Sequence, residues 1–130
     1  TARHPLRTLE RIRAKGARPG IVIDPALPAA AVSELLHAVD LACVMTVNPG
    51  YAGQRLVPRT LPKIGEVAAM AAAEGREVEI EVDGNVSWEN IPRMVAAGAT
   101  VLVAGSSSLY DGAGLAANLA RIRALLGRDG

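Results

Sequence analysis

Three short segments of the sequence contain residues suited to binding a phosphate group or moving a proton. In the first, residues 48–54, Asn-Pro-Gly turns the chain sharply, and Gly50 and Gly53 flank Tyr51 and Ala52. Glycines at such positions let backbone N–H groups approach a ligand closely. This segment is expected either to fold over a phosphate as a lid or to be a plain turn between a strand and a helix.

The second segment, residues 81–85, places a carboxylate directly before a glycine. Asp83 at the end of a strand can ligate a metal or transfer a proton, while Gly84 and Asn85 permit a positive φ. An Asp-Gly pair is also a common turn, so this segment alone leaves both interpretations open.

The third segment, residues 103–108, leads from a predicted strand toward a helical region. Gly105 followed by Ser106 can present amides and a hydroxyl to phosphate at a helix N-terminus, or can simply cap that helix. Barrel enzymes frequently build a phosphate site from the loops after strands seven and eight. The second and third segments end consecutive strands, as that arrangement requires.

Short β-rich runs alternate with helical patterns along the whole chain. This order predicts βαβ units and a parallel sheet, within one α/β domain over residues 1–130. Predicted strands cover residues 20–24, 41–47, 77–82 and 100–104. Predicted helices contain the apolar residues of 6–12, 32–39, 61–71, 91–95 and 115–126, with Ser87 as the N-cap of the fourth helix.

Residues 77–83 indicate which α/β architecture is present, since aliphatic residues and carboxylates alternate there and must point to opposite faces of a strand. The central strands of a doubly wound sheet are apolar on both faces. In a (β/α)8 barrel the second face points inward, and catalytic groups lie at the carboxyl ends of the strands. An edge strand with a solvated face would show the same alternation, but the position of Asp83 favours the barrel.

Composition excludes several classes of function. The chain has 14 basic and 13 acidic residues, a net charge of +1, and one cysteine, Cys43. This charge balance gives no reason to expect a nucleic-acid or membrane-surface partner. No apolar run reaches the roughly 18 residues of a membrane span, and the lone cysteine favours the reducing cytoplasm.

Three runs of sequence carry a resemblance to a known family. VMTVNPGYAGQRLVPRTLPKI, EIEVDGNVSWENI and VAAGATVLVAGSSSLY closely resemble the second half of ribulose-phosphate 3-epimerases. The opening HPLRTLERIRAKGARPGIVIDPALP is similar to the segment from the fourth helix through the fifth strand of that family. The resemblance implies a (β/α)8 TIM barrel, of which this chain supplies the C-terminal half, strands 5 to 8 with their flanking helices. Allulose-6-phosphate 3-epimerases are similar too.

The resemblance also implies a reaction, the interconversion of D-ribulose 5-phosphate and D-xylulose 5-phosphate by metal-assisted proton transfer at C3. Asp83 matches the aspartate that ligates the metal and acts as one acid/base group. The metal would be one divalent ion, Zn²⁺, Fe²⁺, Mn²⁺ or Co²⁺. Met45 matches a residue of the enediolate pocket, or is a core methionine. Substrate and phosphate contacts are implied at Gly50, Tyr51, Ala52, Gly53, Gly84, Asn85, Gly105 and Ser106.

The other metal ligands of the family, two histidines and an aspartate on early strands, have no counterpart here. His4 and His37 do not replace them. We therefore expect the chain to be the C-terminal portion of a full epimerase, inactive alone, and a homo-oligomer when full length. The alternatives are a D-allulose-6-phosphate 3-epimerase and a non-catalytic half-barrel that binds phosphosugars.

Overall fold

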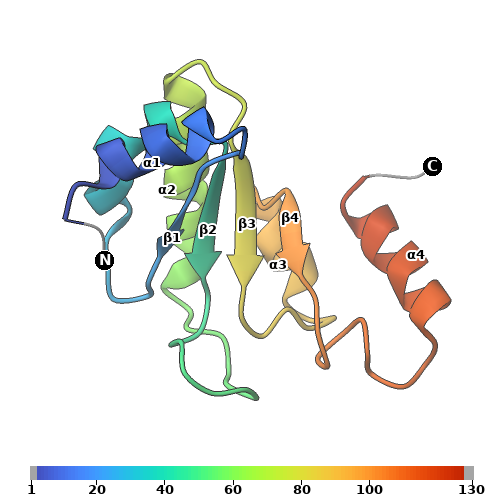
Figure 1. The fold of residues 1–130 in the computed structure, drawn as a ribbon. Coiled ribbons are helices and arrows are strands. Elements are labelled where there is room, and N and C mark those ends of the chain that lie inside the picture. Colours follow the sequence, from blue (N-terminus) through green and yellow to red (C-terminus); the bar gives the residue numbers. More distant parts are fainter. Residues whose placement is uncertain (1–2, 128–130) are drawn as a thin grey trace.

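The computed structural model describes residues 3–127 and consists of strands that alternate with helices. Figure 1 shows this arrangement, which confirms the predicted βαβ organisation. In chain order the elements are α1 (Pro5–Ala14), β1 (Gly20–Ile23), the 3₁₀ helix η1 (Ala29–Ala38), β2 (Leu41–Met45), α2 (Thr60–Ala73), β3 (Glu79–Asp83), α3 (Ile91–Ala96), β4 (Val101–Val103) and α4 (Leu115–Leu125).

The four strands form one parallel sheet in the order β1-β2-β3-β4. Sequential order without a reversal is the arrangement of a barrel, whereas a doubly wound sheet reverses its strand order at a switch point. Ile23, Val44 and Val82 lie at one level of the register on neighbouring strands, and all three are fully buried. On these three strands, the side chains at this level of the register therefore all point toward the helices.

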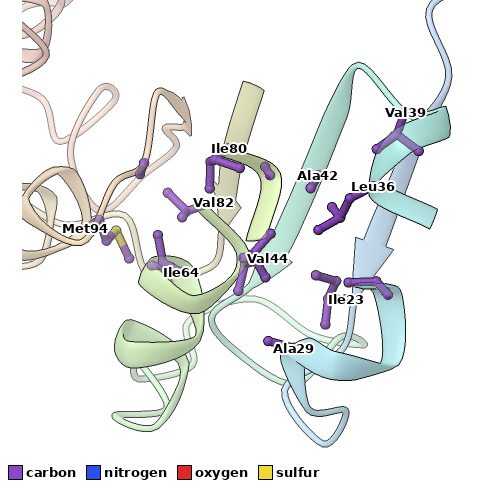
Figure 2. Packing of buried hydrophobic residues seen from close by; sticks show 14 of the residues in the cluster. Ile23, Ala29, Leu36, Val39, Ala42, Val44, Ile64, Ile80, Val82 and Met94 are labelled. Atoms are coloured by element: carbon purple, nitrogen blue, oxygen red, sulfur yellow. The ribbon is translucent and has the colours of Figure 1, made fainter. Parts of the chain in front are cut away.

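The hydrophobic core fills the space between that sheet face and the helices (Figure 2). Helical residues such as Leu36, Ile64 and Met94 are fully buried against Val44 and Val82 of the sheet. Each fully buried side chain of this size stabilises the fold by about 1.5–3 kcal/mol. The helices therefore hold the strands, and with them the loops that follow the strands, in a fixed arrangement.

The opposite face of the sheet is polar and partly open. On β3 the side chains of Glu79, Glu81 and Asp83 alternate with buried Ile80 and Val82, which confirms the predicted parity. Apolar side chains on the same open face remain uncovered, with Val22 65% exposed and Val103 44% exposed. This is the face that points inward in a (β/α)8 barrel.

Several predicted boundaries differ from the structure. The second helix is a 3₁₀ helix, and it buries Ala29, Val32 and Leu36 against the core. β3 begins at Glu79 rather than at residue 77. The fourth helix begins at Ile91 with Asn90 as N-cap, so the prediction of Ser87 as N-cap was wrong. The Ser87 hydroxyl instead accepts a hydrogen bond from the Asn90 amide (3.3 Å), within the turn that precedes α3.

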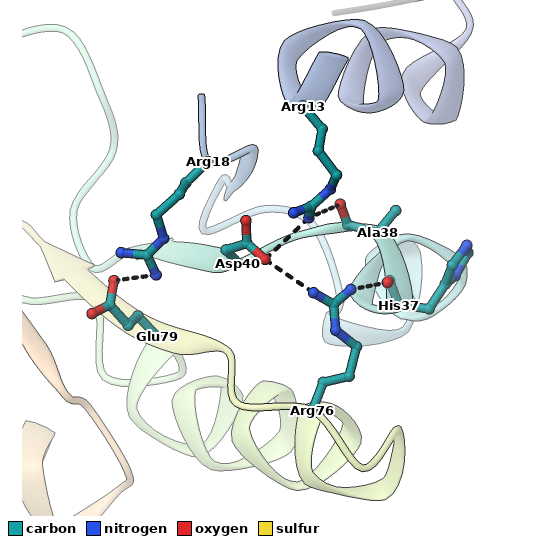
Figure 3. A network of polar contacts seen from close by, with 7 residues as sticks. All are labelled: Arg13, Arg18, His37, Ala38, Asp40, Arg76 and Glu79. Atoms are coloured by element: carbon teal, nitrogen blue, oxygen red, sulfur yellow. Dashed lines mark hydrogen bonds and ion pairs between the residues drawn. The ribbon is translucent and has the colours of Figure 1, made fainter. Parts of the chain in front are cut away.

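Charged side chains gather at the amino ends of the strands (Figure 3). The Asp40 carboxylate, just before β2, lies 3.0 Å from the Arg13 guanidinium and 2.9 Å from that of Arg76. The hydrogen bond from Arg13 lowers the pKa of Asp40, with smaller contributions from the charges of Arg13 and Arg76. Arg18 pairs with Glu79 at 3.1 Å. In barrels this end serves stability, so chemistry is expected at the other end.

Within residues 3–127, the helices lack the length and apolar character needed to cross a membrane.

Candidate active site at the carboxyl ends of the strands

The strand register brings the three candidate segments to one edge of the sheet. Met45 pairs with Asp83, and Asp83 pairs with Val103, so β2, β3 and β4 end at the same level. The loops that follow these strands extend from the arrowheads in the same direction (Figure 1). Residues separated by more than fifty positions in the sequence therefore border a common space.

A pocket of about 340 Å³ lies between these loops. Half-buried Asp83 lines it, together with the segments predicted to cover the substrate. Gly105 and Ser106 are absent from this lining among the described residues, and Ser107 occupies the corresponding place on the third loop. The full lining is Met45, Val47, Asn48, Pro49, Gly50, Tyr51, Ala52, Gly53, Gln54, Asp83, Gly84, Asn85 and Ser107.

Larger hollows occur elsewhere, so volume alone does not identify the site. One of about 610 Å³ borders Lys63, whose buried ammonium group donates to the carbonyls of Asp24 (3.1 Å) and Pro25 (2.7 Å). Burial lowers the pKa of Lys63. Its cation therefore supports the loop after β1 rather than a ligand. Another hollow, of about 500 Å³, lies at the amino ends of the strands beside Arg18 and Arg76.

Buried Thr46 joins the end of β2 to the end of β3. Its backbone N–H donates to the Asp83 carbonyl at 2.8 Å. Its hydroxyl oxygen lies 2.5 Å from the Gly84 carbonyl and 3.1 Å from the Asp83 carbonyl. Because Thr46 is fully buried, these contacts satisfy polar groups that have no access to water. They also fix the backbone that carries the Asp83 side chain.

The loop after β2 is closed at its base and open at its tip. The Val57 amide donates to the Thr46 carbonyl at 2.8 Å, which closes the loop where it leaves the sheet. The Gln54 carboxamide donates to the carbonyls of Asn48 and Tyr51 and braces the tip from within. Tyr51 itself is 75% exposed. The loop after β2 therefore has a fixed base and an exposed tip.

Gly84 and Asn85 turn the chain directly after Asp83. Gly84 has a φ of +123°, and a Cβ atom there would lie 2.5 Å from a methyl group of Val47. Asn85 has a φ of +48°, and among the described residues it is the one residue other than glycine with a positive φ. Its Oδ1 accepts hydrogen bonds from the Leu56 amide and from the Asn90 carboxamide, both at 3.0 Å. The Asn85 side chain thus braces the loop after β2, a role that the sequence pattern did not reveal.

The third segment forms a turn rather than a helix N-terminus, because α4 begins only at Leu115. The amides of Ser108 and Tyr110 donate to the Gly105 carbonyl at 3.2 and 3.1 Å. Within residues 3–127, the backbone N–H groups of Ser106 and Ser107 donate to no acceptor. The run of three serines was the signal for Ser107, but only the fold shows which serine reaches the pocket.

The groups around Asp83 limit the chemistry that this pocket supports. Cys43 and Glu81 share its sheet face, and burial, followed by the hydrogen bond with Glu81, raises the pKa of the Cys43 thiol to about 12. This thiol therefore stays protonated near neutral pH. His4 precedes α1 and His37 belongs to η1, and neither lines the pocket. Asp83 is thus the acidic side chain of the described lining.

A carboxylate beside open backbone amides and glycine-rich loops suits one class of protein. Asp83 can exchange a proton with a bound molecule, while the amides can bind an anion such as phosphate. Together with a parallel sheet in barrel order, these features are typical of part of a (β/α)8 barrel whose functional site lies at the carboxyl ends of the strands.

Comparison with known proteins agrees with this description. A profile of the ribulose-phosphate 3 epimerase family matches residues 1–109. The chain is 42% identical over 105 residues to a ribulose-phosphate 3-epimerase of Bacillus subtilis, covering 80% of this chain and 48% of that protein. It is 44% identical over 109 residues to the enzyme of that name from Rhodobacter capsulatus, covering 84% and 46%. For the chloroplastic ribulose-5-phosphate-3-epimerase of Arabidopsis thaliana the identity is 40% over 104 residues, covering 80% and 37%.

The chain belongs to the ribulose-phosphate 3-epimerase family. It spans about half the length of the bacterial relatives described above. Its parallel four-stranded sheet with flanking helices is consistent with a partial (β/α)8 barrel of this family.

Proposed function

We propose that the chain forms the carboxyl-terminal part of an enzyme that interconverts D-ribulose 5-phosphate and D-xylulose 5-phosphate. The supporting observation is the half-buried Asp83 carboxylate in a pocket rimmed by the glycine-rich loop after β2 and by Ser107. Relatives that carry the name of this activity are about 40% identical over most of the chain. A free, buried Cys43 fits the cytoplasm as the site of this reaction.

Asp83 acts in this proposal as one acid/base group for the proton at C3 of the ketose phosphate. Breaking the C3–H bond transfers the proton to a carboxylate, and the electron pair delocalises onto the C2 oxygen as an enediolate. A second group returns a proton to the opposite face of C3, which inverts that carbon. Since Asp83 is the acidic residue of the described lining, the second group must come from outside that lining.

Residues that border the pocket would bind the rest of the substrate. Glycine and serine amides of the loops after β2 and β4 are suited to the phosphate group, because open backbone N–H groups bind anions. The lid loop around Tyr51 would exclude water from the enediolate, which protects it from side reactions. Gly50, Tyr51, Ala52, Gly53, Gly84, Asn85, Gly105 and Ser106 remain the predicted contacts, to which we add Ser107.

The described residues do not hold a divalent metal by themselves. Within residues 3–127, no group of three histidine, cysteine, aspartate or glutamate side chains lies close enough to bind an ion. The protonated thiol of Cys43 is no ligand either. Asp83 would therefore supply one ligand, and the metal that the resemblance implies would need further ligands from outside this part of the chain.

Complementation tests the proposed function. The purified chain would be mixed with the part of the Bacillus subtilis relative that it does not match, and turnover of D-ribulose 5-phosphate measured with added Mn²⁺ or Zn²⁺. We expect turnover by the mixture and none by either fragment alone. Absence of turnover by a mixture that forms a folded complex would contradict the proposal. Faster turnover of D-allulose 6-phosphate would contradict the assignment of a five-carbon substrate.

A further inference from the structure

A buried carboxamide on α4 contacts the loop that follows β4. Asn118 is only 6% exposed, and its Nδ2 group lies 3.2 Å from the carbonyls of both Ser108 and Leu109. The same group lies 2.7 Å from Oδ1 of Asp111. Two N–H bonds thus serve three acceptors, and all three acceptors belong to the segment that joins β4 to α4. Asn118 therefore fixes the path of this segment.

Asp111 links Asn118 to the loop after β3. Its Oδ2 accepts a hydrogen bond from the Trp88 indole at 2.7 Å, and its Oδ1 also accepts one from the Ala113 amide at 2.9 Å. These hydrogen bonds, that of Trp88 first, lower the pKa of Asp111. The Arg121 guanidinium stacks 4.1 Å above the centre of the Trp88 ring. Asn118 and Arg121 of α4 are thereby joined to Trp88 of the loop after β3.

The turn between β4 and this network carries the open amides of Ser106 and Ser107. On one side, Val103 is held in register with Asp83. On the other, the Ser108 hydroxyl donates to the Val86 carbonyl at 2.6 Å, and Asn118 holds the Ser108 carbonyl. The turn is therefore fixed at both ends, and Ser107 lies at the pocket as a result.

This anchor lies outside the part of the chain that the family profile covers. The profile ends at residue 109, whereas Asp111, Asn118 and Arg121 follow it. The family profile therefore ends before α4, although α4 supplies a buried side chain that contacts the loop after β4.

We propose that Asn118 is a positioning residue that holds the turn of residues 105–108 so that the amides of Ser106 and Ser107 bind the phosphate group of the substrate. Asp111 orients Asn118 for this task. The inference rests on the proposed function, because it takes a phosphorylated ligand as the occupant of the pocket. Displacement of a binding group by about 1 Å can reduce binding or rate by up to ~100-fold, so loss of this anchor has a measurable effect.

Binding of inorganic phosphate to the isotopically labelled chain tests the proposal by NMR. We expect the amide signals of Ser106 and Ser107 to shift saturably in the wild-type chain. In Asn118→Ala the dissociation constant rises about tenfold. Asn118→Asp has the same effect, since a carboxylate of equal size cannot donate to the Ser108 carbonyl and repels Asp111. Arg123→Ala, an exposed change on the same helix, leaves the dissociation constant unchanged.

Asp111→Ala provides a second variant at an exposed position, in case removal of a buried carboxamide unfolds the chain. It is expected to weaken phosphate binding about threefold or more. In the complemented enzyme, Asn118→Ala is expected to raise KM about tenfold and to change kcat less than twofold. A purely structural role would instead lower the amount of folded enzyme without changing KM.

Two results would overturn the proposal. One is a wild-type chain whose Ser106 and Ser107 signals do not respond to phosphate. The other is a pair of folded variants, at positions 118 and 111, that bind phosphate as tightly as the wild type. Failure of the proposed function is distinguishable, because it leaves the phosphate titration intact while the complemented wild-type enzyme shows no turnover.

Discussion

Substitution of Gly84 by alanine measures how tightly the ends of β2 and β3 are packed beneath the pocket. A Cβ atom at residue 84 would lie 2.5 Å from a methyl group of Val47 and 2.8 Å from the Val47 backbone nitrogen. Backbone atoms cannot give way as the end of a flexible side chain can. Overpacking of this kind costs about 1–3 kcal/mol. The φ of +123° adds about 1–2 kcal/mol for a side chain in the left-handed region.

The unfolded state offsets part of this cost, because alanine restricts the unfolded chain by about 0.4–1 kcal/mol relative to glycine. We therefore expect Gly84→Ala to lower the free energy of unfolding by about 2–4 kcal/mol. Two glycines serve as matched controls. Gly53 has a φ of +79° with open space around its Cβ position, so alanine there costs about 1 kcal/mol. Gly105 has open space and no positive φ, so alanine there is neutral or slightly stabilising.

Urea unfolding followed by circular dichroism provides the measurement. With a slope of about 1–3 kcal/mol per M for a domain of this size, Gly84→Ala is expected to shift the midpoint down by about 1–2 M. The midpoints should fall in the order Gly105→Ala, Gly53→Ala, Gly84→Ala. Equal midpoints for Gly84→Ala and Gly53→Ala would refute the close contact with Val47. The two strand ends would then not be packed as described.

Two further substitutions and one chemical modification test other parts of the structure. Asp40→Asn removes both ion pairs with Arg13 and Arg76 and should lower stability by about 1 kcal/mol. Because folding lowers the pKa of Asp40, this contribution to stability is present above the unfolded pKa near 4 and is lost as the pH falls through the folded pKa. Urea midpoints of the wild-type chain and of Asp40→Asn, measured at pH 7 and at pH 3, check this expectation. A difference between the two midpoints that is the same at both pH values would contradict it. The Cys43 thiol is buried and has a pKa of about 12, so it should resist a thiol reagent at pH 8 in the folded chain and react within minutes in urea. Rapid reaction without urea would contradict the burial of this thiol. Thr46→Val should cost about 1–3 kcal/mol, because the Gly84 carbonyl loses its donor while the backbone N–H of residue 46 still donates to the Asp83 carbonyl. An unchanged urea midpoint would show that the threonine hydroxyl does not hold that backbone.

The sequence pattern predicted the sheet and the position of Asp83, because both follow from local periodicity. Aliphatic residues that alternate with carboxylates can be buried on one face only, so the parity of β3 was determined before its partners were known. The glycine-rich segment around Tyr51 was equally visible, since Asn-Pro-Gly followed by a second glycine is compatible with few structures. Parallel order then brings these segments to one edge of the sheet.

Contacts between loops were not predictable in this way. The Asn85 side chain suits a positive φ, but its hydrogen bond with the Leu56 amide joins segments 29 residues apart. Ser107 belongs to the described lining of the pocket and Ser106 does not, and no local pattern distinguishes three consecutive serines. Similarly, Gly105 and Ser106 were interpreted as a possible helix N-terminus, whereas hydrogen bonds to the Gly105 carbonyl close a turn there.

Exchange of the C3 hydrogen with solvent tests most directly whether Asp83 is the acid/base group of this pocket. The complemented enzyme would be incubated with D-ribulose 5-phosphate in D₂O, and deuterium at C3 measured by NMR. We predict exchange by the wild type and by Glu81→Gln, whose carboxylate shares the sheet face but lies outside the pocket lining of the described residues. Asp83→Asn should lose exchange by at least ~100-fold while it retains the wild-type circular dichroism spectrum. Exchange by Asp83→Asn at the wild-type rate would contradict the account.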